Sequence, residues 1–266
     1  MTAMHPSSHP HAHPGATPSG PEAHGLAAML KTSTQDVHTR TERHAFQRLL
    51  MTGQLGREGW VAQLGQGLLV HRALVAALKA AAAKGGPAAS IFREHHEYPQ
   101  RYEADLRFFG GDPSAVKPLA PTSRLLAEID AAGRSSTGVL ALIGYLYVVE
   151  GSTNGAKFIS QALVRALQLS DASGLSSLDP HGDLQRERWG AFRASLDTLP
   201  LDDSQKALVV TGAHAFFEYM IEMFDAILPT LGFSPERVAQ LNAAAGRPPH
   251  GAPGVVTPGR PAPATA

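Results

Sequence analysis

Apolar residues recur every three or four positions along most of this chain, and we find no internal repeat and no convincing alternation of the kind that strands require. Such a period gathers the apolar side chains on one face of a helix, which other helices can then bury. Turn signals such as GGP at residues 85–87 separate the periodic segments. The predicted helices cover residues 25–52, 56–84, about 99–109, 122–132, 139–169, 184–196, 203–228 and 234–245. The pattern therefore predicts an all-α fold of seven or eight helices in a single domain.

The stretch from Val139 to Leu169 differs from the others because its helical pattern contains two glycines one turn apart, Gly151 and Gly155. Each glycine inside a helix costs about 1 kcal/mol relative to alanine, so the pair needs a reason. One explanation is close helix packing or a kink, which the spacing alone favours. The other is a flat ligand that lies against the bared backbone. The predicted apolar face comprises Leu140, Ile143, Tyr147, Val148 and Gly151, then Phe158, Ile159, Leu163, Ala166 and Leu167.

Both ends of the chain differ in composition from the part between them. Residues 1–24 are rich in Pro, Ser, Gly and His, and residues 247–266 are rich in Pro and Gly. Segments with so few large apolar residues cannot bury enough surface to offset the entropy of ordering, so we expect two disordered tails around one folded domain at 25–246. His-rich tracts can bind metal or stray haem, but a solubilising tail is the preferred interpretation. The first tail holds His5, His9, His11, His13 and His24.

The composition excludes several classes of function. The 266-residue chain has no cysteine, which rules out disulfides, thiolate zinc sites, thiolate-ligated haem and C-x-x-C-H haem attachment. A formal net charge of zero gives no electrostatic case for nucleic acid or an anionic membrane as partner. No apolar run reaches membrane-spanning length without a polar or charged break, and the N-terminus lacks the order of a signal peptide. We therefore expect no membrane partner and a cytoplasmic location.

Familiar catalytic motifs are absent from the sequence. There is no G-x-G-x-x-G after a strand, no P-loop, no nucleophile elbow and no pair of E-x-x-H motifs. The neighbours His95 and His96, within EHHE, invite a metal-site interpretation, but adjacent residues on a helix point about 100° apart. Pro99 instead places both histidines in the turn before a helix. What remains is an all-helical domain with one well-placed histidine and one glycine-kinked helix.

That histidine is His38, which lies beside the apolar face of the first predicted helix with Glu42 one turn further on. A carboxylate at this spacing can hold an imidazole in one tautomer and leave its other nitrogen free as a neutral metal ligand. Taken alone, a single histidine on an amphipathic helix is more often a surface or satisfied core residue. Lys31, taken alone, is a solvated lysine.

Two segments change the interpretation of His38 and Lys31, because both segments resemble one known family. GYLYVVEGSTNGAKFI, at residues 144–159, resembles the distal helix of bacterial haem oxygenases, and LKTSTQDVHTRTE, at residues 30–42, resembles their proximal helix. The resemblance extends more weakly over residues 26–231 and covers neither tail. It implies a single haem-oxygenase-like multi-helix domain with haem held between a proximal and a glycine-kinked distal helix. The same resemblance places His38 at the proximal iron ligand, with Glu42 beside it, and Lys31 near a haem propionate.

On the distal side, the resemblance implies that Gly151 and Gly155 let the backbone approach the open face of the haem. Ser152 and Asn154 could anchor a distal water network, or they could simply satisfy backbone groups freed by the kink, and both explanations stay open. Either Tyr145 or Tyr147 would face a propionate, and the spacing does not choose between them. Arg186, together with Arg188 and Arg193, would cover the propionate edge and present a face to an acidic electron donor.

The implied activity is oxidative cleavage of haem, which is both cofactor and substrate, by O2 and external electrons to biliverdin, CO and ferrous iron. Electrons would come from a ferredoxin or a reductase, and the biliverdin could pass to a bacterial phytochrome. The alternative is a non-catalytic haem-binding or haem-trafficking protein on the same fold, which the His-rich N-terminus motivates; a helical interaction module without haem is a third possibility. Many relatives have glycine where Ala156 stands and leucine where Asn154 stands, so the meso carbon that is cleaved could differ.

Overall fold

The computed structural model describes residues 25–245, with the side chains of residues 156, 244 and 245 left out. Every regular element in that range is a helix, so the predicted all-α class is confirmed. The predicted tails lie outside the described residues. The α-helices are α1 Leu26–Ser33, α2 Gln35–Glu42, α3 Ala45–Met51, α4 Gly56–Ala82, α5 Pro87–Ile91, α6 Pro99–Phe108, α7 Ala120–Gly133, α8 Gly138–Ser152, α9 Ala156–Ala166, α10 Gln185–Asp197, α11 Asp203–Thr230 and α12 Pro235–Ala245. Short 3-10 turns lie at Glu94–His96, Thr153–Gly155 and Gly182–Leu184.

The described residues thus form twelve α-helices, more than the seven or eight expected, because polar side chains break two long periodic segments and the short helix α5 was not predicted. The first predicted helix is three helices. The Thr34 hydroxyl donates to the Leu30 carbonyl oxygen at 2.8 Å where α1 gives way to α2. The His44 ring accepts from the Phe46 N–H at 3.1 Å and caps α3. At α11, Asp202 caps the helix and accepts from the Gln205 N–H at 2.8 Å.

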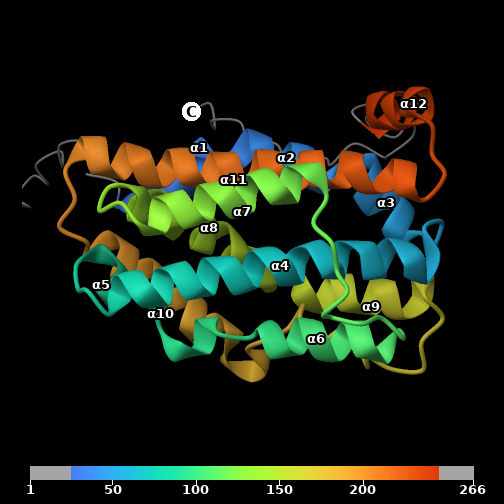
Figure 1. Ribbon diagram of the computed structural model, residues 1–266, viewed down its shortest axis with the longest axis horizontal. Helices are drawn as coiled ribbons and strands as arrows, with labels where there is room; N and C mark the ends of the chain where they lie inside the picture. Colours follow the sequence, from blue (N-terminus) through green and yellow to red (C-terminus); the bar gives the residue numbers. More distant parts are fainter. Residues whose placement is uncertain (1–24, 246–266) are drawn as a thin grey trace, which may run out of the picture.

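Two long helices organise the fold. In Figure 1, α11 and α4 run along the long axis of the molecule, α7 lies between them, and α12 sits at one end. The most extensive helix contact joins α11 to α8. Leu142, Ile143 and Leu146 are fully buried, so α8 is apolar on nearly every side rather than along one stripe. The distal segment is therefore anchored in the core along its first half.

Glycines make the contact between α8 and α11 possible. A methyl group on Gly144 would overlap the Val209 carbonyl oxygen, and one on Gly212 would overlap the Ala141 carbonyl oxygen. These atoms belong to backbone and cannot move aside as a side chain can, so the two helices cross here at backbone distance.

Replacing Gly144 with alanine should therefore destabilise the protein. Overpacking a core costs about 1–3 kcal/mol, which lowers the Tm of a domain this size by roughly 2–4 °C for each kcal/mol. Thermal unfolding followed by circular dichroism measures the change. Gly190→Ala is the matched control, because a methyl there meets nothing within 4 Å and should raise helix propensity. An unchanged Tm for Gly144→Ala would contradict the close crossing.

The expectation that Phe158 belongs to the buried face of its helix is wrong. Leu163 and Leu167 are buried as predicted, but Phe158 is 79% exposed. The 3-10 turn at Thr153–Gly155 interrupts the helix before α9. A period counted through that turn assigns the wrong rotation to the first residues of α9.

Both α4 and α11 are long and apolar enough to cross a membrane by length and composition alone. About half of the apolar window of each is buried inside the fold, 50% for α4 and 44% for α11. Central helices of a helical bundle pass the same test, so this finding is weak support for a membrane span.

Candidate haem site

The proximal side of the candidate site is α2, which lies against α11. Val37 and Thr41 are buried, and Arg40 pairs with Glu218 of α11 at 2.7 Å. His38 sits between them at the edge of this contact, with its ring edge-on to Phe217 at a centroid distance of 5.4 Å. The packing of α2 therefore fixes where the His38 imidazole lies.

The imidazole of His38 is open to a ligand. Its side chain is 45% exposed, and within residues 25–245 the ring makes no hydrogen bond. Nδ1 lies 3.7 Å from a carboxylate oxygen of Glu42, which is too long for a hydrogen bond but close enough to favour a proton on that nitrogen. Nε2 is then left as the lone-pair nitrogen. Lys31, about two turns earlier on α1, is exposed.

The distal side is the break between α8 and α9. Three successive side chains there donate to the carbonyl oxygens three residues before them: Ser152 to Val149 at 2.7 Å, Thr153 to Glu150 at 2.7 Å and Asn154 to Gly151 at 2.9 Å. These bonds satisfy carbonyl groups that the break in the helix frees, which agrees with a structural role for Ser152 and Asn154 at the kink. They use the hydroxyl proton of Ser152, which keeps only its capacity to accept.

The two glycines at the break are not explained by helix packing. A methyl on Gly151 would meet the Trp189 ring at 3.5 Å, and one on Gly155 would meet Ile159 at 3.6 Å, both ordinary contacts. Neither glycine is fully buried. Unlike Gly144, they leave partly exposed backbone against which no backbone of another helix packs. A strip of this kind has room for a flat ligand that side chains would hold away.

The structure separates the two candidate tyrosines. Tyr145 points its hydroxyl toward Glu128 of α7 at 3.5 Å, and burial followed by this carboxylate raises the pKa of Tyr145 to about 12. Tyr147 packs on Trp189 of α10 at 5.5 Å, and burial raises its pKa while the charge of Arg193 opposes that rise. Tyr147 thus lies beside a cation and Tyr145 beside an anion, so Tyr147 suits a propionate better.

One face of α10 borders the same region. Arg186, Trp189 and Arg193 recur at spacings of three and four, so they share that face, and Trp189 marks it as the side next to Gly151. Arg188 belongs to another face and donates to the His181 ring at 3.0 Å. At the end of α10, Asp197 accepts from the Ala27 N–H at 2.8 Å and ties this helix to α1. Helix α10 therefore links the distal break to the proximal helices.

Sequence reasoning missed Trp189 as a site residue, and in the structure it faces Gly151. The helical pattern puts Phe217 with Phe216 and Phe224 on the core face of the last long helix, from which one or two of them could line the pocket wall, and in the structure Phe217 packs on His38. The available signal for Trp189 was its position between Arg186 and Arg193 on one helical face. The pattern did not show which of the three phenylalanines would contact the site, because the partner of Phe217 is remote in the sequence.

Comparison with known proteins identifies the family. The family model described as Heme oxygenase matches residues 24–226, well over half of the chain. This chain belongs to the haem oxygenase family. Like other members, it is an enzyme that binds haem and degrades it to biliverdin, and the haem-trafficking alternative is not favoured.

Individual relatives of this haem oxygenase support the same family assignment. It is 32% identical over 135 residues to the haem oxygenase PigA of Pseudomonas aeruginosa, covering 48% of this chain and 67% of that protein. It is 27% identical over 218 residues to haem oxygenase 2 of Synechocystis sp., covering 78% of this chain and 86% of that protein. The structure of Synechocystis haem oxygenase-2 with haem and NO superposes with a TM-score of 0.73 at 21% identity, over 89% of this chain and 100% of that one. The predicted haem-oxygenase-like fold is confirmed.

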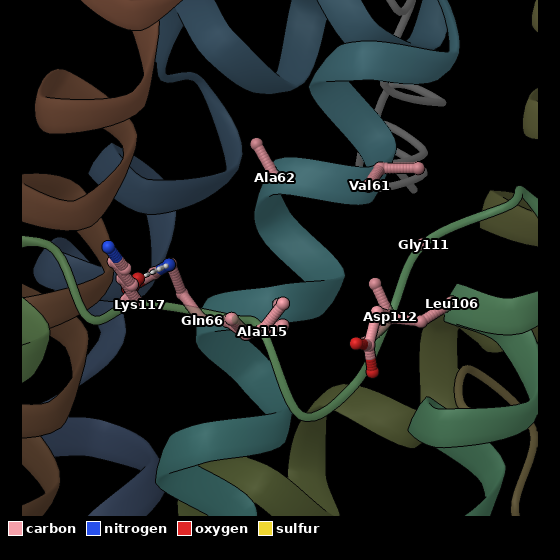
Figure 2. Close-up of a pocket in the computed structure, with 10 residues that line it drawn as sticks. Val61, Ala62, Gln66, Leu106, Gly111, Asp112, Ala115 and Lys117 are labelled. Carbon is pink, nitrogen blue, oxygen red and sulfur yellow. Dashed lines mark hydrogen bonds between the residues drawn. The ribbon is translucent and has the colours of Figure 1, made fainter.

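A surface groove elsewhere on this haem oxygenase is a poor candidate for the haem. It has a volume of about 300 Å³ and lies between α4 and the loop that follows α6 (Figure 2). Its central polar group, the Gln66 amide, already donates to the Lys117 carbonyl oxygen at 3.1 Å and accepts from the Leu119 N–H at 2.9 Å. No residue of α2, α8 or α9 lines it.

Two buried histidines of the haem oxygenase lie near the distal helix: His71 packs on Tyr98, whose hydroxyl donates to Glu150 of α8, and His96 packs on Phe192 of α10. Burial lowers the pKa of His71 to about 4. Burial, followed by repulsion from His95, lowers the pKa of His96 to about 3. Both rings are neutral in the folded protein at pH values where the unfolded chain already protonates them, below about 6.5.

Stability should therefore fall as the pH is lowered from about 6.5 toward 4, because the unfolded chain binds the extra protons. Each of these two rings contributes at most about 1.4 kcal/mol per pH unit across that window. Urea unfolding at several pH values measures the slope, and His71→Gln should reduce it. A slope that does not change in this variant would contradict the neutral, buried state of His71.

Proposed function

We propose that this haem oxygenase holds haem between α2 and the break at α8–α9, with Nε2 of His38 as the axial ligand to the iron. The observation that carries the proposal is the pairing of two features that the fold leaves unused. These are an imidazole on α2 whose ring makes no hydrogen bond within residues 25–245, and partly exposed glycine backbone at the α8–α9 break. The donor set fits haem, because a neutral imidazole is a common axial ligand and no cysteine competes with it. The proposed haem-binding domain spans residues 25–246.

Each remaining candidate has a role in this proposal. Gly151 and Gly155 carry no side chain that would project toward the distal face of the haem. Glu42 favours the tautomer in which His38 can bind iron. Ser152 and Asn154 hold the break in shape through their bonds to the backbone, and the Ser152 oxygen can accept from a distal water.

The cationic side chains suit the propionate edge of the haem. Lys31 is exposed on α1, and Arg186 and Arg193 are exposed on the α10 face that Trp189 shares. Tyr147 is the tyrosine that we assign to a propionate, in preference to Tyr145. Because a propionate is an anion, cations around it favour one seating of the haem and oppose its reversal.

Bound haem supplies the iron at which O2 is activated, and its own porphyrin is the substrate that is oxidised. We propose that the electrons come from a ferredoxin or a reductase, that the reaction takes place in the cytoplasm, and that a bacterial phytochrome is one acceptor of the biliverdin. The exposed arginines of α10 offer a positive face to an acidic donor protein.

A reaction in the cuvette tests the proposal. One equivalent of haemin is added to the purified protein in air, with catalase and either a ferredoxin system or ascorbate, and the absorption spectrum is followed. We expect the Soret band to decay as a biliverdin band grows, and we expect no reaction without O2 or without reductant. A stable Soret band that only shifts on reduction would indicate a haem carrier. No Soret band on mixing would contradict the site itself.

A further inference from the structure

Glu150 is the residue directly before the distal Gly151, yet its side chain points into the protein. It is 4% exposed, and its carboxylate lies 2.7 Å from Nε2 of His181. The other carboxylate oxygen accepts from the Tyr98 hydroxyl at 3.4 Å. His181 itself belongs to the long loop between α9 and α10 and is 5% exposed. A buried carboxylate is retained in a fold only with such partners, because desolvation penalises its charge.

The second nitrogen of His181 fixes the direction of these bonds. Arg188 of α10 donates to Nδ1 at 3.0 Å, and a guanidinium can only donate. Nδ1 is therefore an acceptor, and the proton of the neutral ring is on Nε2, where it is donated to Glu150. The three side chains form a continuous bridge, with a neutral imidazole between a carboxylate and a guanidinium.

This bridge joins the two elements that form the distal wall. Gly151 and Trp189 directly follow Glu150 and Arg188, and a methyl on Gly151 would meet the Trp189 ring at 3.5 Å. A second tie is parallel to it, since the Gln185 amide donates to Asn154 at 3.2 Å. Because the bridge connects the neighbours of both residues, we expect a change in it to alter the distance between the Gly151 backbone and the Trp189 ring.

We propose that Glu150, His181 and Arg188 are positioning residues for haem cleavage, which set how closely Trp189 approaches the distal glycines and hence how the haem is seated. This inference rests on the proposed function. A bridge that only stabilised the fold would change Tm and leave the geometry of the haem complex alone. The two roles can therefore be separated by measurements that report geometry.

The first variant is His181→Phe, which fills the site but can neither donate to Glu150 nor accept from Arg188. His181→Gln is the conservative rescue, because its amide can do both. His44→Phe is the matched control, since His44 is a buried histidine (6% exposed) bonded to Asp225 at 3.1 Å in a different part of the fold. Arg188→Leu is a second disruption, from a partly exposed position that should tolerate the change.

The first readout needs no haem. The chain has two tryptophans, and Trp60 is buried, so acrylamide quenching reports mainly Trp189. We expect quenching to change in His181→Phe and Arg188→Leu, and to match the wild type in His181→Gln and His44→Phe. The second readout is the C–O stretching frequency of the ferrous CO complex together with the ratio of biliverdin isomers. Both should shift in the two disrupted variants alone, although His44→Phe should also lower Tm.

Wild-type quenching, CO frequency and isomer ratio in a folded His181→Phe and a folded Arg188→Leu would overturn the inference. Should His181→Phe fail to fold, the results for Arg188→Leu alone decide whether the inference holds. The failure of the proposed function has a different signature, because the wild-type protein would then show no Soret band or no turnover. The quenching result can still be read in that case.

Discussion

Replacing His38 with alanine is expected to abolish the normal haem spectrum. The ring is the axial ligand that we propose, and its removal should weaken haem binding by more than the roughly 10- to 100-fold that loss of a hydrogen-bonding partner to a ligand costs. The fold should survive, because the side chain is 45% exposed and within residues 25–245 makes no hydrogen bond. A haemin titration followed at the Soret band measures the loss.

Two controls make the His38 result specific. His214→Ala removes another partly exposed histidine, on α11, and should leave the spectrum unchanged. Added imidazole should restore the spectrum of His38→Ala by occupying the space that the side chain leaves. A wild-type spectrum and affinity in His38→Ala would mean that another residue binds the iron.

Replacing Gly151 with valine should stop turnover without unfolding the protein. The first carbon of the new side chain has room, because the Trp189 ring is 3.5 Å away. The two further methyl groups would occupy the space that we assign to the distal side of the haem. We expect haem cleavage to slow by at least about tenfold, the equivalent of roughly 1.4 kcal/mol of barrier, while Tm changes by a few degrees.

Gly190→Val is the matched control for Gly151→Val, because it is also a helix glycine and has no atom within 4 Å of a methyl. It bears the same cost in helix propensity but should turn over at the wild-type rate. Equal rates for Gly151→Val and Gly190→Val would show that the distal face lies elsewhere.

Helix positions could be predicted from the sequence because they depend on neighbours in the chain. The period of apolar residues located α4 and α11. His38 and Glu42 could be paired because they are one turn apart on one helix. Phe158 was assigned to the wrong face because a 3-10 turn resets the helical phase, and no residue count shows that in advance.

Contacts between distant segments could not be predicted in this way. Nothing in the sequence near Glu150 indicates that His181, on a loop beyond α9, will donate a hydrogen bond to its carboxylate. The glycines illustrate the same limit. The pattern drew attention to Gly151 and Gly155, whereas the glycines that packing requires are Gly144 and Gly212, and their neighbours belong to another helix. Because helix packing requires Gly144 and Gly212 but does not require Gly151 and Gly155, a ligand is the favoured explanation for Gly151 and Gly155.

The most direct measurement of the central claim is a crystal structure of the full-length protein with haemin. Our account predicts one haem with its iron bound to Nε2 of His38, its opposite face against the backbone of Gly151 and Gly155, and Trp189 at its edge. Haem held by another histidine, or seated in the groove between α4 and the loop after α6, would contradict it.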